Sequence, residues 1–503
     1  MLKRIFTLLG LLLCNSHLLF AQQTPAKFVS KGIESLPMFR ELLALANDAH
    51  FPTDIEKNIQ WCEEAFAKRG FTSQRLQTPT VPLLLAERKS KKKNAKTVLI
   101  YLQVDGQPVA PPFWNQKNPY KAELMEQDAE GNWAPISWER IGQNPDPDWR
   151  IFARSASDAK GPVAAYLTAL DMIADEKKKI PFHMKVILDF EEELGSPQLP
   201  KAVVENREAL AADMLVIFDG PRHLKNEPTL TFGARGISTL TLTLYGPIRP
   251  QHSGHYGNYV PNPALRLSQL LASMKDEEGR VTIPGYYDGI SLDSDTKAIL
   301  QAVPDDEENI RKKMGIAATD RVANTYQESI QYPSLNIRGL SSGWVGSEKR
   351  TIIPSSATAE IDMRLVIESE PERLIQLVKD HIKNEGFTLL DRPPTEEERE
   401  QKSRLIQVES TTSYLAYRTE MDSEIGVWLT RALTKSFGKS PIRQRTSGGS
   451  IPISPFVNEL GIPAVTVPTV NRDNNQHSPN ENIRLGNYFD GIRTIYGILT
   501  EKI

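Results

Sequence analysis

The sequence predicts an α/β protein with a mainly parallel sheet and an inserted α+β domain. Between residues 36 and 219, short apolar runs alternate with segments of helical apolar spacing, as expected for a parallel sheet covered by helices on both faces. Residues 237–245 and 357–366 instead alternate between apolar and polar side chains, which is typical of half-buried strands in a different sheet. A buried-strand pattern returns at 464–467, so the middle region is predicted to interrupt the first domain.

The helices are predicted from apolar spacing and from helix-start signals. The segment at 54–68 opens with the Asp of a Pro-Thr-Asp sequence, and the segment at 163–174 follows an Asp and a Pro, both common at a helix start. Further helical spacing lies at 36–46, 371–384 and 424–437. The basic run 87–96 is predicted to be a solvated turn between strands, with a phosphate-binding segment as the alternative. The charged, proline-containing stretch 391–400 is predicted to be an exposed connection.

The composition is that of a soluble globular chain with more than one domain. Of 503 residues, 40% are hydrophobic, and the formal net charge is -3. A charge so close to neutral argues against nucleic acid as a dedicated partner.

The first 21 residues are predicted to be a secretory signal peptide. Two basic residues precede the apolar run 5–13, and Ala21 is a small residue suited to cleavage. This run is shorter than the roughly 20 residues of a spanning helix, so we expect no stable membrane anchor and a periplasmic or secreted protein. A lipoprotein anchored at Cys14 is the less favoured alternative, because the bulky Leu13 precedes it. Cleavage leaves only Cys62, which excludes an intramolecular disulfide.

Acidic residues, a glutamine and a histidine follow the ends of several predicted strands. They are Gln103 and Asp105 after 98–102, Glu192 and Glu193 after 182–188, Asp219 after 214–218, and His477 after 462–467. Ligands bind at this edge of an open α/β sheet. Carboxylate oxygens with imidazole nitrogen suit zinc or a similar divalent ion.

Each of these residues also has a simpler interpretation. The acidic run at 191–193 can be a solvated loop, Asp158 a helix cap, Asp219 a turn residue and His477 a loop residue. Because all of them are predicted at one edge, we favour the metal site over the separate interpretations.

The ordered motifs resemble the co-catalytic zinc metallopeptidase family of carnosine dipeptidases, aminoacylases, succinyl-diaminopimelate desuccinylase and glutamate carboxypeptidases. The resemblance covers nearly all of the chain after about residue 25. The motifs are Ser157-Asp158-Ala159-Lys160-Gly161, Glu192-Glu193-Leu194-Gly195-Ser196, Asp219, His252-Ser253-Gly254-His255-Tyr256-Gly257, Arg364-Leu365-Val366, Gly448-Gly449-Ser450-Ile451-Pro452 and His477-Ser478-Pro479-Asn480-Glu481. The resemblance is greatest to the dipeptidase branch.

The resemblance implies a role for each site residue. Asp158 would bridge two metals, Glu193 and His477 would complete one metal site, and Asp219 would complete the other. Glu192 would be the general base and later the general acid toward the leaving amine. Its simpler interpretation is an exposed neighbour of Glu193.

The chain departs from the family at its first motif, where His-x-Asp is replaced by Gln103-Val104-Asp105. We expect Asp105 to accept a hydrogen bond from the Gln103 amide group, turning the amide oxygen toward the metal. Because amide oxygen is a poorer zinc donor than imidazole, we expect one tight Zn²⁺ and a second ion that is weaker or of another divalent kind.

The inserted domain contributes further residues by resemblance. Family members dimerise and extend a histidine into the neighbouring active site, and His252 matches that residue; its alternative is an ordinary loop histidine. Arg364 is predicted to bind the substrate carboxylate, together with backbone N–H groups of Gly448, Gly449 and Ser450. The alternatives are a solvent-facing strand arginine and a tight turn.

These inferences give a domain plan and a function. The plan is a signal peptide at 1–21, a zinc-peptidase catalytic domain at 22–235 and 391–503, and a ferredoxin-like dimerisation or lid domain at 236–390. We expect a homodimeric, metal-dependent, exo-acting peptidase that hydrolyses dipeptides or short peptides. The alternatives are an N-acyl-amino-acid deacylase that uses the same site and, because of Gln103, a non-catalytic binding protein.

Overall fold

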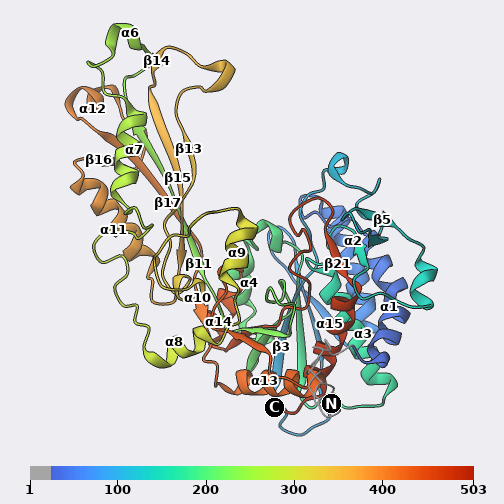
Figure 1. The fold of residues 1–503 in the computed structure, drawn as a ribbon. Helices are drawn as coiled ribbons and strands as arrows, with labels where there is room; N and C mark the ends of the chain where they lie inside the picture. The colour runs from blue at the N-terminus through green and yellow to red at the C-terminus, as the bar shows by residue number, and fades with distance from the viewer. Residues whose placement is uncertain (1–23) are drawn as a thin grey trace, which may run out of the picture.

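The structure, a computed structural model, describes residues 24–503 and has two connected domains, one built around a large sheet and one extending away from it (Figure 1). The predicted signal peptide and its cleavage point near Ala21 lie outside the described residues. Within the described part of the chain, no helix combines the length and apolarity needed to cross a membrane.

The first domain is built on an eight-stranded sheet whose middle strands are parallel. Its order is β1 (Thr72–Leu76), β2 (Leu83–Arg88), β7 (His183–Asp189), β3 (Thr97–Gln103), β8 (Met214–Ile217), β20 (Ala464–Thr466), β9 (Thr229–Thr231) and β19 (Ile442–Gln444). Strands β7, β3, β8 and β20 run parallel to one another, whereas β2 and β9 are antiparallel to their neighbours in this group. The middle strands are buried along almost their whole length, as the continuous apolar runs predict.

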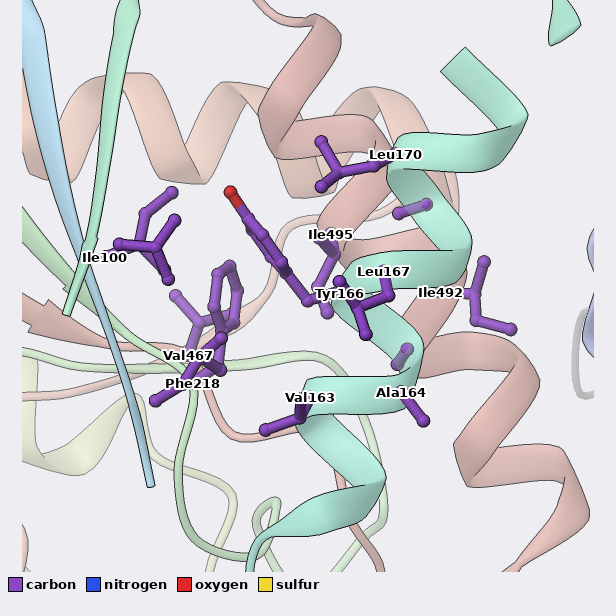
Figure 2. Packing of buried hydrophobic residues seen from close by; sticks show 14 of the residues in the cluster. Ile100, Val163, Ala164, Tyr166, Leu167, Leu170, Phe218, Val467, Ile492 and Ile495 are labelled. Atoms are coloured by element: carbon purple, nitrogen blue, oxygen red, sulfur yellow. The ribbon is translucent and has the colours of Figure 1, made fainter. Parts of the chain in front are cut away.

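Helices cover both faces of this sheet, as predicted. One face carries α1 (Ala26–Ala44), α2 (Pro52–Ala67), α3 (Lys160–Asp175), α13 (Glu424–Phe437) and α15 (Leu485–Thr500). The other carries α4 (Leu199–Glu205), α5 (Arg207–Leu210) and α14 (Ser454–Leu460). Figure 2 shows α3 side chains, including Tyr166 and Leu167, packed between the sheet residue Ile100 and Ile492 of α15. This packing fixes the start of α3, two residues after Asp158.

A small second sheet joins distant parts of the sequence near the site. Its order is β21 (Asn482–Arg484), β6 (Arg150–Phe152), β4 (Glu123–Gln127) and β5 (Trp133–Pro135). The pairing of β21 with β6 brings the segment that follows His477 next to the segment that precedes Asp158.

The second domain has a five-stranded sheet with helices on one face. The order is β13 (Asn336–Ser341), β15 (Ser356–Leu365), β11 (Gly236–Tyr245), β17 (Leu405–Tyr414) and β16 (Thr388–Leu390). Strands β11 and β15 alternate between buried and half-buried side chains, as predicted. Their buried side chains pack with α7 (Pro263–Ser273) and α11 (Pro371–Asn384) in a separate core.

Short elements complete the second domain. They are β12 (Gln251–His252), α6 (Ser253–Tyr256), α8 (Ser294–Gln301), α9 (Glu307–Met314), α10 (Tyr326–Ser329), β14 (Ile352–Ile353) and α12 (Glu396–Gln401). Short 3-10 segments lie at Pro111–Phe113, Trp138–Gly142 and Glu192–Leu194 in the first domain and at Gly346–Glu348 in the second domain.

The end of the second domain differs from the prediction. Strand β17 lies beyond the predicted boundary at 390 but belongs to the second sheet, because it pairs with β11 over most of its length. The stretch 391–400, predicted as a connection, contains most of α12, which begins at a capping box between Thr395 and Glu398. The chain leaves and re-enters the first domain where β10 (Gly233–Ala234) pairs with β18 (Tyr417–Arg418).

Candidate metal centre and active site

The parallel strands deliver the candidate residues to one edge of the large sheet. Gln103 is the last residue of β3, Asp219 lies two residues beyond β8, and Glu192 and Glu193 follow β7 in a 3-10 turn. His477 lies in the loop between β20 and β21. Because β7, β3, β8 and β20 are neighbours, their carboxyl ends bring these residues together.

Asp158, Glu193 and His477 form a compact group of possible metal ligands. One ligand atom from each lies within 4.8 Å of the other two. The His477 Nε2 atom is 3.0 Å from Asp158 Oδ2 and 3.3 Å from Glu193 Oε2. The carboxyl side chains of Asp158 and Glu193 are only 7% and 4% exposed. Two buried carboxylates and an imidazole at these distances fit a divalent cation.

The charges of the site are arranged to receive a cation. Burial, with the nearby Asp158, raises the pKa of Glu193 to about 8 and that of Asp219 to about 7. Burial, Asp219 and Asp158 raise the pKa of Glu192 well above its ordinary value. The hydrogen bond with Asp158, supported by Glu193, raises the pKa of His477 to about 9. Each carboxyl shift reflects negative charge concentrated in a dry site, which a bound cation would offset.

The orientation predicted for Gln103 is wrong. Its Nε2 donates to Asp158 Oδ1 at 2.8 Å, and Asp105 Oδ2 instead accepts the backbone N–H of Glu193 at 2.9 Å. The physical reason is that the amide N–H groups are directed to the carboxylate at the centre of the acidic cluster. Among the described residues, Gln103 Oε1 and Asp105 Oδ1 have no hydrogen-bond partner.

Asp158 does not cap the helix that follows it. The N-cap residue of α3 is Ala159, and no side chain caps this helix. The Asp158 carboxylate is directed to Gln103 and His477, which removes the helix-cap interpretation.

Glu481 holds the Asp158 segment in place. This carboxylate is fully buried. Its Oε1 accepts hydrogen bonds from Ser157 N, Ser157 Oγ and Asp158 N at 2.9–3.0 Å. Its Oε2 accepts Arg154 Nη1 at 2.8 Å and Ser155 N at 2.9 Å. Because Glu481 lies four residues after His477, it ties the two ligand-bearing loops together.

The turn that carries Glu192 and Glu193 is fixed from both sides. Asp189 Oδ2 accepts hydrogen bonds from Tyr101 Oη and Ser196 Oγ at 2.9 and 2.5 Å. From the second domain, Tyr414 Oη donates to the Gly195 carbonyl at 2.9 Å. The φ of Gly195 is +85°, and a Cβ there would lie 2.3 Å from the Tyr414 hydroxyl, so this turn requires glycine.

The predicted carboxylate-binding residues meet at the boundary between the domains. Arg364 is the second-to-last residue of β15. Its Nη1 donates a hydrogen bond to Ser450 Oγ at 2.8 Å. Arg235 is 8% exposed, and its backbone N–H donates to the Gly449 carbonyl at 3.2 Å. Its guanidinium Nη2 donates to the carbonyls of Tyr332 and Arg364 at 2.9 and 3.4 Å. Arg235 therefore holds both the strand and the loop of this cluster.

His252 is not near the ligand group of its own chain. It lies in β12 beside α6, at the tip of the second domain that is farthest from the large sheet (Figure 1). Its Nδ1 accepts the Gly254 backbone N–H at 3.0 Å, so the neutral ring carries its proton on Nε2.

Several contributing residues were missed by sequence reasoning. Gln107 Nε2 donates to Glu193 Oε2 at 2.8 Å, and Gln476 Nε2 lies 3.3 Å from Asp158 Oδ2. Arg235 and Tyr414 act across the domain boundary. The one available signal was proximity, because Gln107 and Gln476 lie two and one residues from Asp105 and His477; the inter-domain contacts have no local signature.

The chain is similar in sequence to known peptidases. A family model described as a peptidase dimerisation domain matches residues 232–388. The Cys-Gly metallodipeptidase of Schizosaccharomyces pombe is 26% identical over 423 residues, covering 82% of this chain and 81% of that protein. The Beta-Ala-His dipeptidase of Homo sapiens is 26% identical over 362 residues, covering 70% of this chain and 69% of that protein.

A solved structure shares the whole architecture. The M20 family metallo-carboxypeptidase Sso-CP2 from Sulfolobus solfataricus superposes with a TM-score of 0.75 at 26% identity, covering 93% of this chain and 98% of that one. The resemblance inferred from the motifs and the predicted fold class are both confirmed.

Proposed function

Because this chain belongs to the M20 family of metallopeptidases, we propose that it is a metal-dependent dipeptidase acting on dipeptides or short peptides with a free carboxylate. The observation that carries the proposal is the position of Glu192 next to the Asp158, Glu193 and His477 group. The similarity to the Cys-Gly and Beta-Ala-His dipeptidases supports a dipeptide substrate.

We propose zinc as the ion held by Asp158, Glu193 and His477, since one imidazole and two carboxylates are typical zinc ligands. The ion would supply Lewis-acid chemistry at the scissile carbonyl. Glu192 would take a proton from the attacking water and deliver it to the leaving amine, because it directly precedes the ligand Glu193 in the 3-10 turn at the site.

Substrate binding would use the residues at the domain boundary. Arg364 would pair with the terminal carboxylate in a planar, charge-assisted contact. Ser450, already hydrogen-bonded to Arg364, and the Gly448–Gly449 backbone would complete this subsite. A carboxylate fixed there sets the distance to the metal group, which favours exo-acting cleavage of short substrates.

The active assembly would be a homodimer. The match of a peptidase dimerisation domain to residues 232–388 supports this, as does the position of His252 far from its own metal group. Across a dimer, the His252 Nε2–H would donate to the developing oxyanion in the neighbouring site. We further propose that the mature chain begins after cleavage near Ala21 and acts in the periplasm or outside the cell.

The proposal is tested by a hydrolysis screen with purified mature protein. Dipeptides, C-terminally amidated dipeptides and N-acyl-amino acids are compared before chelation, after chelation and after Zn²⁺ is restored. Free dipeptides should be hydrolysed best, and chelation should abolish the activity reversibly. Preference for N-acyl-amino acids would instead identify a deacylase, and no turnover of any substrate by zinc-loaded dimer would identify a binding protein.

A further inference from the structure

Glutamine side-chain amides donate hydrogen bonds to the carboxylates of the candidate metal centre. Gln103 and Gln476 donate to the two different oxygens of Asp158, at 2.8 and 3.3 Å, and Gln107 donates to Glu193 Oε2 at 2.8 Å. An amide N–H donor at a carboxylate oxygen offsets part of its charge without an ion. The number of cations that this centre can hold therefore depends on which amides are fixed in place: the Gln103 contact is buried, whereas those of Gln107 and Gln476 are only part-buried.

The two oxygens of Asp158 have different surroundings. Oδ2 lies 3.0 Å from His477 Nε2 and belongs to the group that fits a divalent ion. Oδ1 accepts the Gln103 amide N–H at 2.8 Å. A second ion bridged by Asp158 would need Oδ1, which is the atom that Gln103 already uses.

Gln103 is held in this orientation by its surroundings. The side chain is at the buried end of β3 and is only 2% exposed. If the amide were turned over, its oxygen would lie 2.8 Å from a carboxylate oxygen, a repulsive contact. Asp105 does not accept the Gln103 amide N–H, because its Oδ2 accepts a hydrogen bond from the Glu193 backbone N–H instead.

We propose that Gln103 takes the place of a second metal ion, so that the centre holds a single divalent cation on Asp158, Glu193 and His477. The Gln103 N–H supplies the positive partner that Asp158 Oδ1 would otherwise find in a cation. Asp219 then lies beside Asp158 as a carboxylate without an ion. The inference rests on the metal centre of the proposed function and is independent of the substrate.

Metal stoichiometry of the wild-type protein is the direct test. The protein is saturated with Co²⁺ or Zn²⁺, freed of excess metal by gel filtration and analysed by mass spectrometry of the metal. One ion per chain is expected, and the Co²⁺ electron paramagnetic resonance spectrum should show isolated ions without magnetic coupling. Two ions per chain, or a coupled spectrum, would overturn the proposal.

Two substitutions assign the effect to Gln103. Gln103→His provides an imidazole in place of the amide and should raise the stoichiometry to two ions per chain. Gln103→Leu removes the N–H donor without adding a ligand and should leave it at one. A folded Gln103→His protein that still holds one ion would show that other residues close the second position. Loss of the ion in Gln103→Leu would show that Gln103 is itself a ligand. Either result contradicts the proposal.

This test is separate from the test of activity. A protein with one ion and no peptide hydrolysis would contradict the proposed function alone. An active peptidase with two ions would contradict the role of Gln103 alone. Circular dichroism and the melting temperature of each variant show whether a changed stoichiometry comes from unfolding, and the wild-type measurement stands without any variant.

Discussion

Arg364 of the second domain donates a hydrogen bond to Ser450 of the first domain, with Nη1 and Oγ 2.8 Å apart. The two residues are 86 positions apart in the sequence: Arg364 lies in β15 of the second sheet, whereas Ser450 lies in a loop of the first domain. The proposed carboxylate subsite therefore combines residues of both domains.

Arg364→Ala should weaken substrate binding through the loss of a charge-assisted contact. Such contacts contribute about 1.5–3 kcal/mol, so KM for free dipeptides should rise roughly 10- to 100-fold. Steady-state kinetics on a dipeptide and on its C-terminal amide measure this, because the amide lacks the carboxylate and should be hardly affected. Arg338→Ala is the matched control, since Arg338 lies on the same sheet but is exposed and pairs with Glu360. An equal effect on both substrates would assign Arg364 to folding.

Substitution of Glu192 should affect turnover, whereas substitution of Glu193 should affect metal content. Glu192→Gln removes the proposed base and should lower kcat by about 10²–10⁴-fold while metal content is unchanged. Glu193→Gln removes a ligand and should reduce bound metal. Metal analysis and steady-state kinetics of both variants measure these two effects. Equal metal loss in both would show that the roles are wrongly divided.

His252→Ala should lower kcat by about 10²–10³-fold, the usual effect of losing one oxyanion donor, with little change in metal content. Mixing this variant with Glu192→Gln under conditions of subunit exchange should recover activity. The mixed dimer contains one site with its own Glu192 and the partner's intact His252. Each variant mixed with itself is the control. No recovery after verified exchange would place the action of His252 within its own chain, or outside catalysis.

Glu481→Gln should destabilise the protein and loosen the metal. Five donors converge on the carboxylate, and an amide can accept through one oxygen only. A buried donor left without a partner costs about 1–3 kcal/mol. Thermal unfolding and competition with a chelator should both show a loss. Glu459→Gln, at the exposed ion pair with Arg207, should change neither measurement.

Lys160 should make stability depend on pH. Its ammonium is buried and donates to the carbonyls of Leu42 and Leu45, and burial lowers the pKa to about 7. Because the unfolded state binds more protons between this pKa and the ordinary value of 10.5, stability from this residue rises as the pH rises through that window. Lys160→Met should remove this contribution. Melting temperatures of chelated wild type and variant at pH 7 and pH 9 measure it, and parallel changes would contradict the low pKa.

Several strands and helices of both domains could be predicted because each depends on local patterns. The burial alternation of β11 and β15, and the position of α13, follow from the order of apolar residues. The position of β17 in the second sheet could not be predicted in this way, because its pairing with β11 joins segments that are far apart in the sequence. The orientation of Gln103 was missed for a similar reason: it is decided by which acceptors surround the amide in space.

The Tyr414 hydroxyl connects the second domain to the turn that carries Glu192 and Glu193. Tyr414 ends β17, and its hydrogen bond to Gly195 reaches the turn that presents Glu192 and Glu193. The same domain also carries Arg364, which is hydrogen-bonded to Ser450. One domain thus takes part both in the proposed carboxylate subsite and in holding the turn of the proposed base.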